Sequence, residues 1–248
     1  MQKFFDYNFK GEPFQIFSTY HLYGLLAVLF FAIFLIMALK KLNSAKTNEF
    51  VRYFLAAALL LQEVSLNLWR IWYGKWEVST SLPLHLCGLG IILSSIMLVK
   101  KDYKLYEFLY FWGTAGATQA LLQPDISNFG FPHYRFFQFF VSHGLLFASI
   151  IFATFVFNFR PKFKSIYKAF VITNIFAFFI GLFNFAVGSN YMFIAHKPDT
   201  PSILDFMGPW PLYILPLEFI ALFLFTLVYI PFLVHDLVIK SASIETEN

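Results

Sequence analysis

Cysteine and charge are the two features that are scarcest in this chain of 248 residues. Its single cysteine, Cys87, excludes an intramolecular disulfide framework and any metal site built from several cysteines. Only 13% of the residues are charged and 59% are hydrophobic, whereas about 25% of residues are charged in soluble domains. The composition therefore indicates a polytopic membrane protein. It does not suggest nucleic acid as a partner, because the basic residues lie in loops between apolar segments.

The hydrophobic residues fall into seven segments, each near the ~20 residues that a helix needs to cross a bilayer. A spanning chain must satisfy its backbone hydrogen bonds internally, which favours helices. We therefore predict an all-α fold in which residues 1–248 form a single domain, a bundle of seven transmembrane helices. The predicted segments are 20–39, 51–73, 82–99, 105–122, 136–157, 166–187 and 212–234.

The loops differ in basic residues, and this difference predicts an orientation. The loops after the first, third and fifth segments are rich in lysine and arginine, while the alternate loops contain few. Basic loops remain in the cytoplasm, so the N-terminus is expected outside and the C-terminus in the cytoplasm of a cell-membrane protein. The basic set is Lys40, Lys41, Lys46, Arg52, Lys100, Lys101, Lys104, Arg160, Lys162, Lys164 and Lys168.

Polar residues are concentrated toward the predicted outer side. Counting ~1.5 Å per helical residue places Cys87 roughly 7 Å, His143 about 12 Å and Glu63 about 15 Å inside the outer ends of their segments. Asp125 follows the fourth segment directly. A polar layer is therefore predicted in the outer third of the bundle, at the depth of lipid glycerol and ester groups.

One polar stripe is predicted within the second segment. Glu63, Asn67 and Arg70 follow i, i+4, i+7 spacing and share a helix face. Ionisable groups within a membrane usually face the bundle interior or an aqueous cavity. Such residues also act as interhelical hydrogen-bonding groups without chemistry, and Arg70 and Arg135 near the outer edge could simply extend to the interface. Both readings stay open.

Cys87 is a candidate nucleophile. His85 lies two residues away, on the opposite side of a regular helix, unless Pro83 unwinds the turn, so its base is expected from another helix. His143 is the only histidine deep in another segment. A thiol beside a neutral imidazole can attack an ester and form a thioester. The alternatives are a cysteine that packs as a small apolar residue, and a His143 that is a core residue or a metal ligand. We expect no metal and no cofactor.

Several motifs carry a family resemblance. They are Leu82-Pro83-Leu84-His85-Leu86-Cys87, Trp112-Gly113, Gln119-Ala120-Leu121-Leu122-Gln123-Pro124-Asp125, Phe137-Gln138-Phe139-Phe140-Val141-Ser142-His143-Gly144, Asn190-Tyr191-Met192 and Gly208-Pro209-Trp210-Pro211. Through most of its length the chain resembles the YwaF-type bacterial integral membrane proteins, relatives of the transmembrane protein 164 phospholipid acyltransferase. The resemblance implies acyl transfer from a phospholipid to a lysophospholipid without coenzyme A, with Cys87 as nucleophile and His143 as its partner.

Further roles follow from chemistry and remain unassigned among several residues. Asn67, Gln123 or His85 could donate a hydrogen bond to a developing oxyanion, and Arg70 or Arg135 could hold a phosphate. Glu63 and Asp125 complete the group of candidate substrate-binding residues. Two rival functions stay open: a seven-helix transporter or receptor that binds a small ligand in an outward-facing cavity, and a lipid ester hydrolase in which water replaces the lysolipid.

Overall fold

Helices make up all of the regular secondary structure in the described residues. The structure is a computed structural model that describes residues 2–41, 44–126, 128–198 and 202–245. Five of its helices are long and apolar enough to cross a membrane, which confirms an all-α, multi-pass membrane protein. They are α2 (Thr19–Lys41), α3 (Ala45–Trp72), α7 (Tyr134–Val156), α8 (Phe163–Val187) and α9 (Ile214–Glu245).

Shorter helices lie between and beside these five. The third predicted segment contains α4 (Leu86–Lys100), and the fourth contains α5 (Tyr103–Phe111) and α6 (Ala117–Leu122). A π-helical turn, η1 (Trp112–Gly116), joins α5 to α6. The short elements outside the bundle are α1 (Gln2–Phe5), η2 (Tyr191–Phe193) and η3 (Ile203–Phe206).

The fourth predicted segment, 105–122, is helical throughout, and its α-helix is interrupted by the π-helical turn η1. Two glycines, Gly113 and Gly116, weaken the helical preference there. The Thr114 hydroxyl also donates a hydrogen bond to the Tyr110 carbonyl, a local alternative to regular helix bonding. A methyl group on Gly113 would lie 2.6 Å from Cγ1 of Ile150, so a larger residue would prevent this close approach to α7. π-helical turns of this kind frequently mark functional sites.

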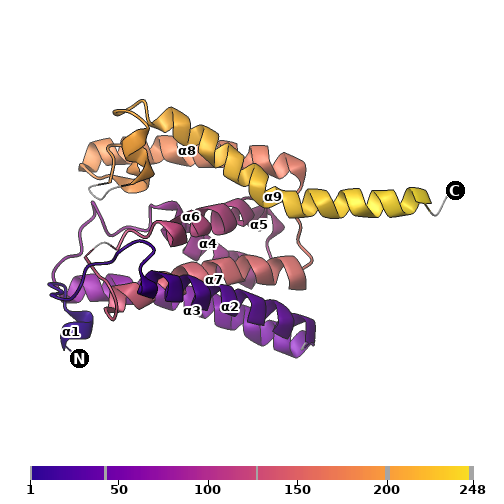
Figure 1. Ribbon diagram of the computed structural model, residues 1–248, viewed down its shortest axis with the longest axis horizontal. Coiled ribbons are helices and arrows are strands. Elements are labelled where there is room, and N and C mark those ends of the chain that lie inside the picture. The colour runs from indigo at the N-terminus through magenta and orange to yellow at the C-terminus, as the bar shows by residue number, and fades with distance from the viewer. Residues whose placement is uncertain (1, 42–43, 127, 199–201, 246–248) are drawn as a thin grey trace.

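The helices run along the long axis of the molecule (Figure 1). α8 and α9 form the layer at the top of this view, α4 to α6 form the middle layer, and α2, α3 and α7 form the layer at the bottom. α7 is the central helix, because it packs against α2, α3, α4 and α6. Two thirds of the residues in an apolar 18-residue stretch of α7 are buried. α8 and α9 instead expose most of their apolar side chains, as expected of helices that face lipid.

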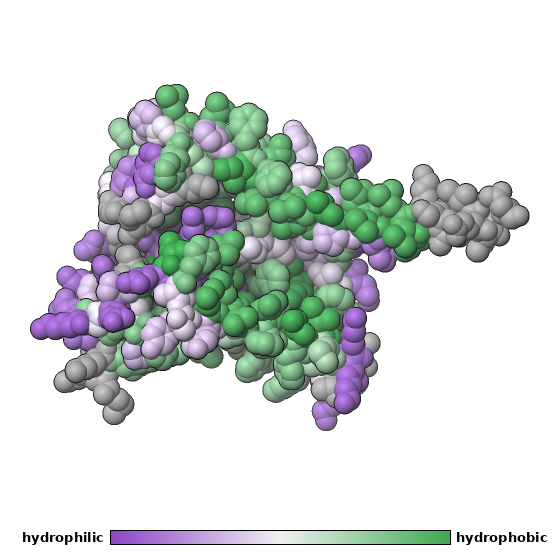
Figure 2. All heavy atoms as spheres, in the orientation of Figure 1, coloured by the Kyte–Doolittle hydropathy of each residue, from purple (hydrophilic) through white to green (hydrophobic). Residues whose placement is uncertain are grey.

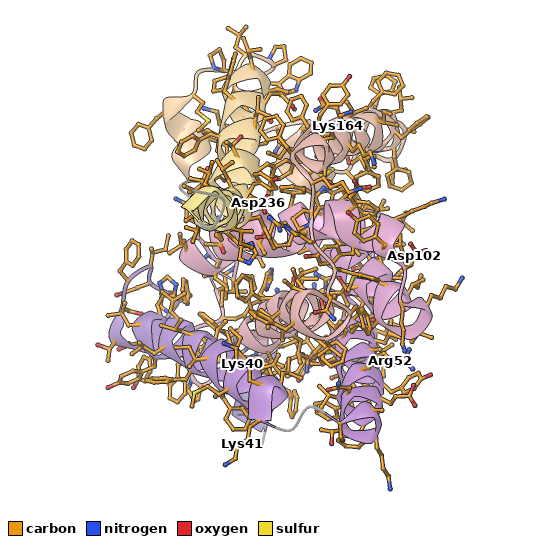
Figure 3. All side chains as sticks on the ribbon, turned by 90° about the vertical axis from the view of Figure 1, so that its right-hand side faces the viewer. Lys40, Lys41, Arg52, Asp102, Lys164 and Asp236 are labelled. Carbon is orange, nitrogen blue, oxygen red and sulfur yellow. The ribbon has the colours of Figure 1, made fainter. Side chains whose placement is uncertain are left out.

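Hydrophilic residues gather at both ends of the long axis, and apolar residues dominate between them (Figure 2). The side chains labelled at one end come from α2, α3, α8 and α9 and from the N-cap of α5 (Figure 3). They are Lys40, Lys41, Arg52, Asp102, Lys164 and Asp236. The N-terminus lies toward the opposite end (Figure 1). We call this second end, which contains the starts of α2, α4 and α7, the site end.

Candidate functional site at the start of α4

Cys87 lies in the first turn of α4, not deep within a helix. The predicted segment began at residue 82, but the helix begins at Leu86, and His85 is its N-cap with an extended backbone (φ −73°, ψ 150°). Pro83 disfavours helical geometry at Leu82, and the chain then makes a tight turn in which Leu84 N–H donates to the Leu82 carbonyl at 2.8 Å before the extended His85. The predicted depth of roughly 7 Å is therefore too large. Cys87 as a residue is half-buried.

The first turn of α4 rests directly on the proline segment. A methyl group on Gly88 would lie 3.0 Å from the Pro83 Cα, so the approach requires a residue without a side chain. Hydrogen bonding within the helix starts at Leu89 N–H, which donates to the His85 carbonyl at 3.0 Å. No side chain caps the preceding N–H groups. Unpaired N–H groups and the positive end of the helix dipole favour a negative charge at this point.

The packing of α4 against α7 sets the level of Cys87. Both helices start at the site end and run in the same direction (Figure 1). A methyl group on Gly90 would lie 3.7 Å from both terminal methyl groups of Leu146. Cys87 precedes Gly90 by three residues, and His143 precedes Leu146 by three residues. Since each step is close to one helical turn, Cys87 and His143 lie at a similar level on adjacent helices.

His143 is buried and held by its own helix. Its Nδ1 lies 2.8 Å from the Phe139 carbonyl oxygen, and its ring packs on the Phe139 ring with centroids 4.2 Å apart. A carbonyl oxygen only accepts hydrogen bonds, so Nδ1 must carry the proton. Within the described residues no hydrogen bond reaches Nε2, and Nε2 is not among the enclosed polar atoms without a partner. The neutral ring therefore offers a free basic nitrogen, as a general base requires.

His85 has the opposite arrangement. Its Nδ1 accepts a hydrogen bond from the backbone N–H of Met192 at 3.3 Å, so in the neutral ring the proton is on Nε2. Burial lowers the pKa of His85, an effect that Asp125 opposes and Arg70 reinforces. His85 is therefore a neutral donor through Nε2 at neutral pH.

The loop after α8 holds His85 in place. The Tyr191 hydroxyl donates to the Val78 carbonyl at 2.7 Å and accepts from Leu82 N–H at 2.9 Å. Asn184, at the end of α8, binds both the N–H and the carbonyl of Tyr191, each at 2.9 Å. The Tyr191 ring also packs edge-on against His85. These contacts fix a loop that is distant in sequence over the start of α4.

Of the stripe on α3, two members bond to each other. The Asn67 amide nitrogen donates to a Glu63 carboxylate oxygen at 3.0 Å and to the Glu63 carbonyl at 2.9 Å. The Asn67 amide oxygen accepts from the Trp76 indole at 2.9 Å. Asn67 thus has partners on both amide atoms, as expected of a structural group.

Two arginines lie at the same end without a carboxylate partner. Arg70 and Arg135 are half-buried, and neither forms an ion pair within the described part of the chain. Arg135 donates to the Gln138 side chain and interacts electrostatically with Arg70, Asp125 and Glu63. A hydrogen bond of 2.7 Å between Ser65 and Tyr134 joins the two helices that carry the arginines. Glu63 and Asp125 act on these guanidinium groups from beyond ion-pair distance, which leaves both groups suited to bind an anionic ligand.

The remaining predicted residues are less closely held. Gln123 is exposed and accepts a hydrogen bond from Gln119 at 3.2 Å. Asp125 is also exposed, and it interacts electrostatically with His85 and Arg135. The described residues contain no group of three histidine, cysteine or acidic residues placed to hold a metal ion.

Sequence reasoning missed Tyr191 and Asn184 and the π-helical turn. Tyr191 lies in the motif Asn190-Tyr191-Met192, but a tyrosine in a loop gives no sign of its partners more than 100 residues away. Trp112-Gly113 likewise marked the position of η1 without revealing its geometry. The motifs were thus a usable signal for the location of these elements, although not for their contacts.

The fold and this end of the bundle define a multi-pass helical membrane protein with a cysteine, two histidines and two arginines gathered at one end. The family model of the TMEM164 family matches residues 16–229, and the chain belongs to that family. The match includes every residue of the site described above. No curated protein and no solved structure matches the chain.

Proposed function

We propose that this protein is a membrane-embedded phospholipid acyltransferase that works through a thioester on Cys87, without coenzyme A. The observation that carries the proposal is the position of Cys87 in the first turn of α4, at the level of His143 with its free Nε2. A thiol, a base and a helix N-terminus are the groups that cysteine acyl transfer needs.

The reaction proceeds in two balanced steps. In the first, His143 Nε2 takes the Cys87 proton, the sulfur attacks the carbonyl carbon of a phospholipid ester, and the C–O bond breaks. The proton passes from His143 to the departing glycerol oxygen, which leaves as a lysophospholipid. In the second, His143 takes the proton of a lysophospholipid hydroxyl, and the hydroxyl oxygen attacks the carbonyl carbon of the thioester. The C–S bond breaks, and His143 returns the proton to the Cys87 sulfur.

The arginines supply recognition of the headgroup phosphate. Arg70 interacts electrostatically with His85 and Arg135 with His143, which supports a position of both arginines near the reacting groups. The phosphate and the esters of a glycerophospholipid are only a few bonds apart, which matches a phosphate site beside the thiol. Glu63 and Asn67 bond to each other within α3, and Gln123 and Asp125 are exposed after the end of α6.

We propose that the site lies near the extracytoplasmic face of the cell membrane. We propose that α4 and the combined α5–η1–α6 segment cross the bilayer together with the five long helices, giving seven crossings in a single domain. The N-terminus is then outside and the C-terminus cytoplasmic. The opposite positions of the two termini along the long axis support this arrangement (Figure 1).

The topology is tested with two exposed positions in a Cys87→Ser background. Thr80 lies between α3 and α4, and Lys164 lies at the start of α8. An impermeant maleimide added to intact cells should label Thr80→Cys and leave Lys164→Cys unlabelled until the cells are permeabilised. The reverse pattern would place the site in the cytoplasmic leaflet.

Activity is tested with purified protein in vesicles that contain a donor phospholipid with a labelled acyl chain and an unlabelled lysophospholipid. We expect label in the newly formed phospholipid, and none with Cys87→Ala. Release of labelled fatty acid instead would identify a hydrolase. Equal transfer by wild type and Cys87→Ala would end the proposal, and tight lipid binding without any chemistry would favour a receptor or transporter.

A further inference from the structure

An acyl transfer at Cys87 also needs a donor for the negative charge that develops on the carbonyl oxygen. Three side chains at this end were candidates: Asn67, Gln123 and His85. Asn67 has its amide nitrogen on Glu63 and its amide oxygen on Trp76. Gln123 accepts from Gln119 through its amide oxygen, so its own N–H groups are unused, but both residues are exposed beyond or near the end of α6 and no buried group fixes the amide. Neither therefore presents a free, fixed N–H group at the start of α4.

His85 does. The Met192 N–H can only donate, so its bond to Nδ1 leaves the proton of the neutral ring on Nε2. Within the described residues Nε2 makes no hydrogen bond, and it is not among the enclosed polar atoms that lack a partner. Rings of Tyr191 and Phe193 pack against the imidazole, with centroids 5.3 Å away in each case. The donor is thus both free and held in a fixed orientation.

The two histidines have complementary tautomers because each bonds to a different backbone group. A backbone carbonyl holds His143 as the Nδ1–H form, whose Nε2 is a base. A backbone N–H holds His85 as the Nε2–H form, whose Nε2 is a donor. His85 is also the N-cap of α4, directly beside the unpaired N–H groups of the first turn. The same residue type thus supplies the two different functions that acyl transfer requires.

We propose that His85 is a catalytic residue whose Nε2–H, together with the first-turn N–H groups of α4, donates to the carbonyl oxygen of the reacting ester and thioester. The proton stays on Nε2 throughout, so the ring stabilises charge and transfers no proton. This role rests on the proposed function at Cys87. It assigns to the loop after α8 the task of fixing the tautomer of His85 through Met192.

Two variants separate the catalytic role from a structural one. In His85→Gln the amide nitrogen reaches the place of Nε2, so the donor is kept and the contact with Met192 is lost. In His85→Asn the amide oxygen takes the place of Nδ1, so the contact with Met192 is kept and the donor is lost. We expect His85→Asn to lower kcat by about 100- to 1000-fold with little change in KM, and His85→Gln to stay within about tenfold of wild type. Thermal unfolding checks that both variants fold.

The opposite order, with His85→Asn active and His85→Gln inactive, would show an anchoring role for His85 and overturn the inference. Equal activity of the two variants would overturn it as well. The proposed function fails separately, if Cys87→Ala retains transfer. A measurement on the wild type needs no variant to fold: nitrogen NMR of labelled histidine should report His85 as the Nε2–H tautomer, and an Nδ1–H tautomer would refute the assignment.

Discussion

The polar groups at the two ends of the bundle differ in their bonding partners. At the end opposite the site, Glu107 accepts hydrogen bonds from Lys168 at 2.9 Å on both carboxylate oxygens and from Ser165 at 2.7 Å. Arg160 there pairs with Asp236 at 2.5 Å. At the site end, Arg70 and Arg135 have no carboxylate partner within the described residues, and both histidines keep a free Nε2.

This difference distinguishes polar groups that pair between helices from cations and histidine nitrogens that have no such partner within the described residues. A matched pair links α5 to α8 at one end, whereas unmatched cations cost stability unless an anion binds them. Variants at the paired end should therefore lower stability, and variants at the site end should lower activity.

The largest effect is expected at the base. His143→Ala removes the nitrogen that accepts the thiol proton, and we expect transfer to fall by about 100- to 10,000-fold. The double variant with Cys87→Ala should be no worse than Cys87→Ala alone, since members of one catalytic unit are not additive. Initial rates in vesicles measure both. Full activity of His143→Ala would show that His143 is not the base and that the two ends do not differ in this respect.

A smaller effect is expected at the arginines. Arg135→Gln or Arg70→Gln removes a charged contact to the headgroup phosphate, which is worth about 1.5–3 kcal/mol and corresponds to roughly 10- to 100-fold in KM. A donor ester that lacks phosphate serves as the control, because its KM should not change. If both donors weaken equally, the arginines act on structure rather than on recognition.

At the opposite end the effect should appear in stability. Lys168→Met leaves the carboxylate of Glu107, a largely buried residue, with Ser165 alone, and we expect the free energy of unfolding to fall by about 1–2 kcal/mol. The matched control is Lys164→Met, also an exposed lysine on α8. Steric trapping in bicelles measures the unfolding free energy. An unchanged value for Lys168→Met would mean that this pair contributes no net stability.

The smallest effect is expected between α8 and α9. The Asn174 amide donates to Glu218 at 2.8 Å, and such bonds within membranes average about 0.6 kcal/mol. Asn174→Ala should lower the unfolding free energy by about this amount and leave transfer intact. Thr226→Ala is the control, because the Thr226 hydroxyl bonds only to its own helix at Leu222. A loss of transfer in Asn174→Ala would extend the functional region to the α8–α9 layer.

Hydropathy was sufficient to predict a helical, multi-pass chain, because apolar length decides whether a helix can span a bilayer. Hydropathy could not locate the start of α4, because Leu82, Leu84 and Leu86 are equally apolar. Only the backbone geometry between Pro83 and His85 shows that the helix begins at Leu86. Cys87 therefore lies at a helix N-terminus rather than inside a helix as the sequence had suggested.

The sequence could propose the residues of a site but not their contacts. Helical spacing placed Glu63 and Asn67 on one face, and the hydrogen bond between them is present. Spacing alone could not show that His85 and His143 have opposite tautomers, because the determining partners are backbone groups of Met192 and Phe139. Such contacts depend on tertiary packing, which one sequence does not reveal.

The most direct test is the mass of the intact protein after incubation with a phospholipid and an acid quench. We expect wild type to gain the mass of one acyl group, located on Cys87 by peptide mapping and released by hydroxylamine, and Cys87→Ala to gain none. Addition of a lysophospholipid before the quench should remove the adduct as the new phospholipid forms. Transfer with no adduct on Cys87 at any time, or an adduct of equal amount in Cys87→Ala, would contradict the thioester mechanism.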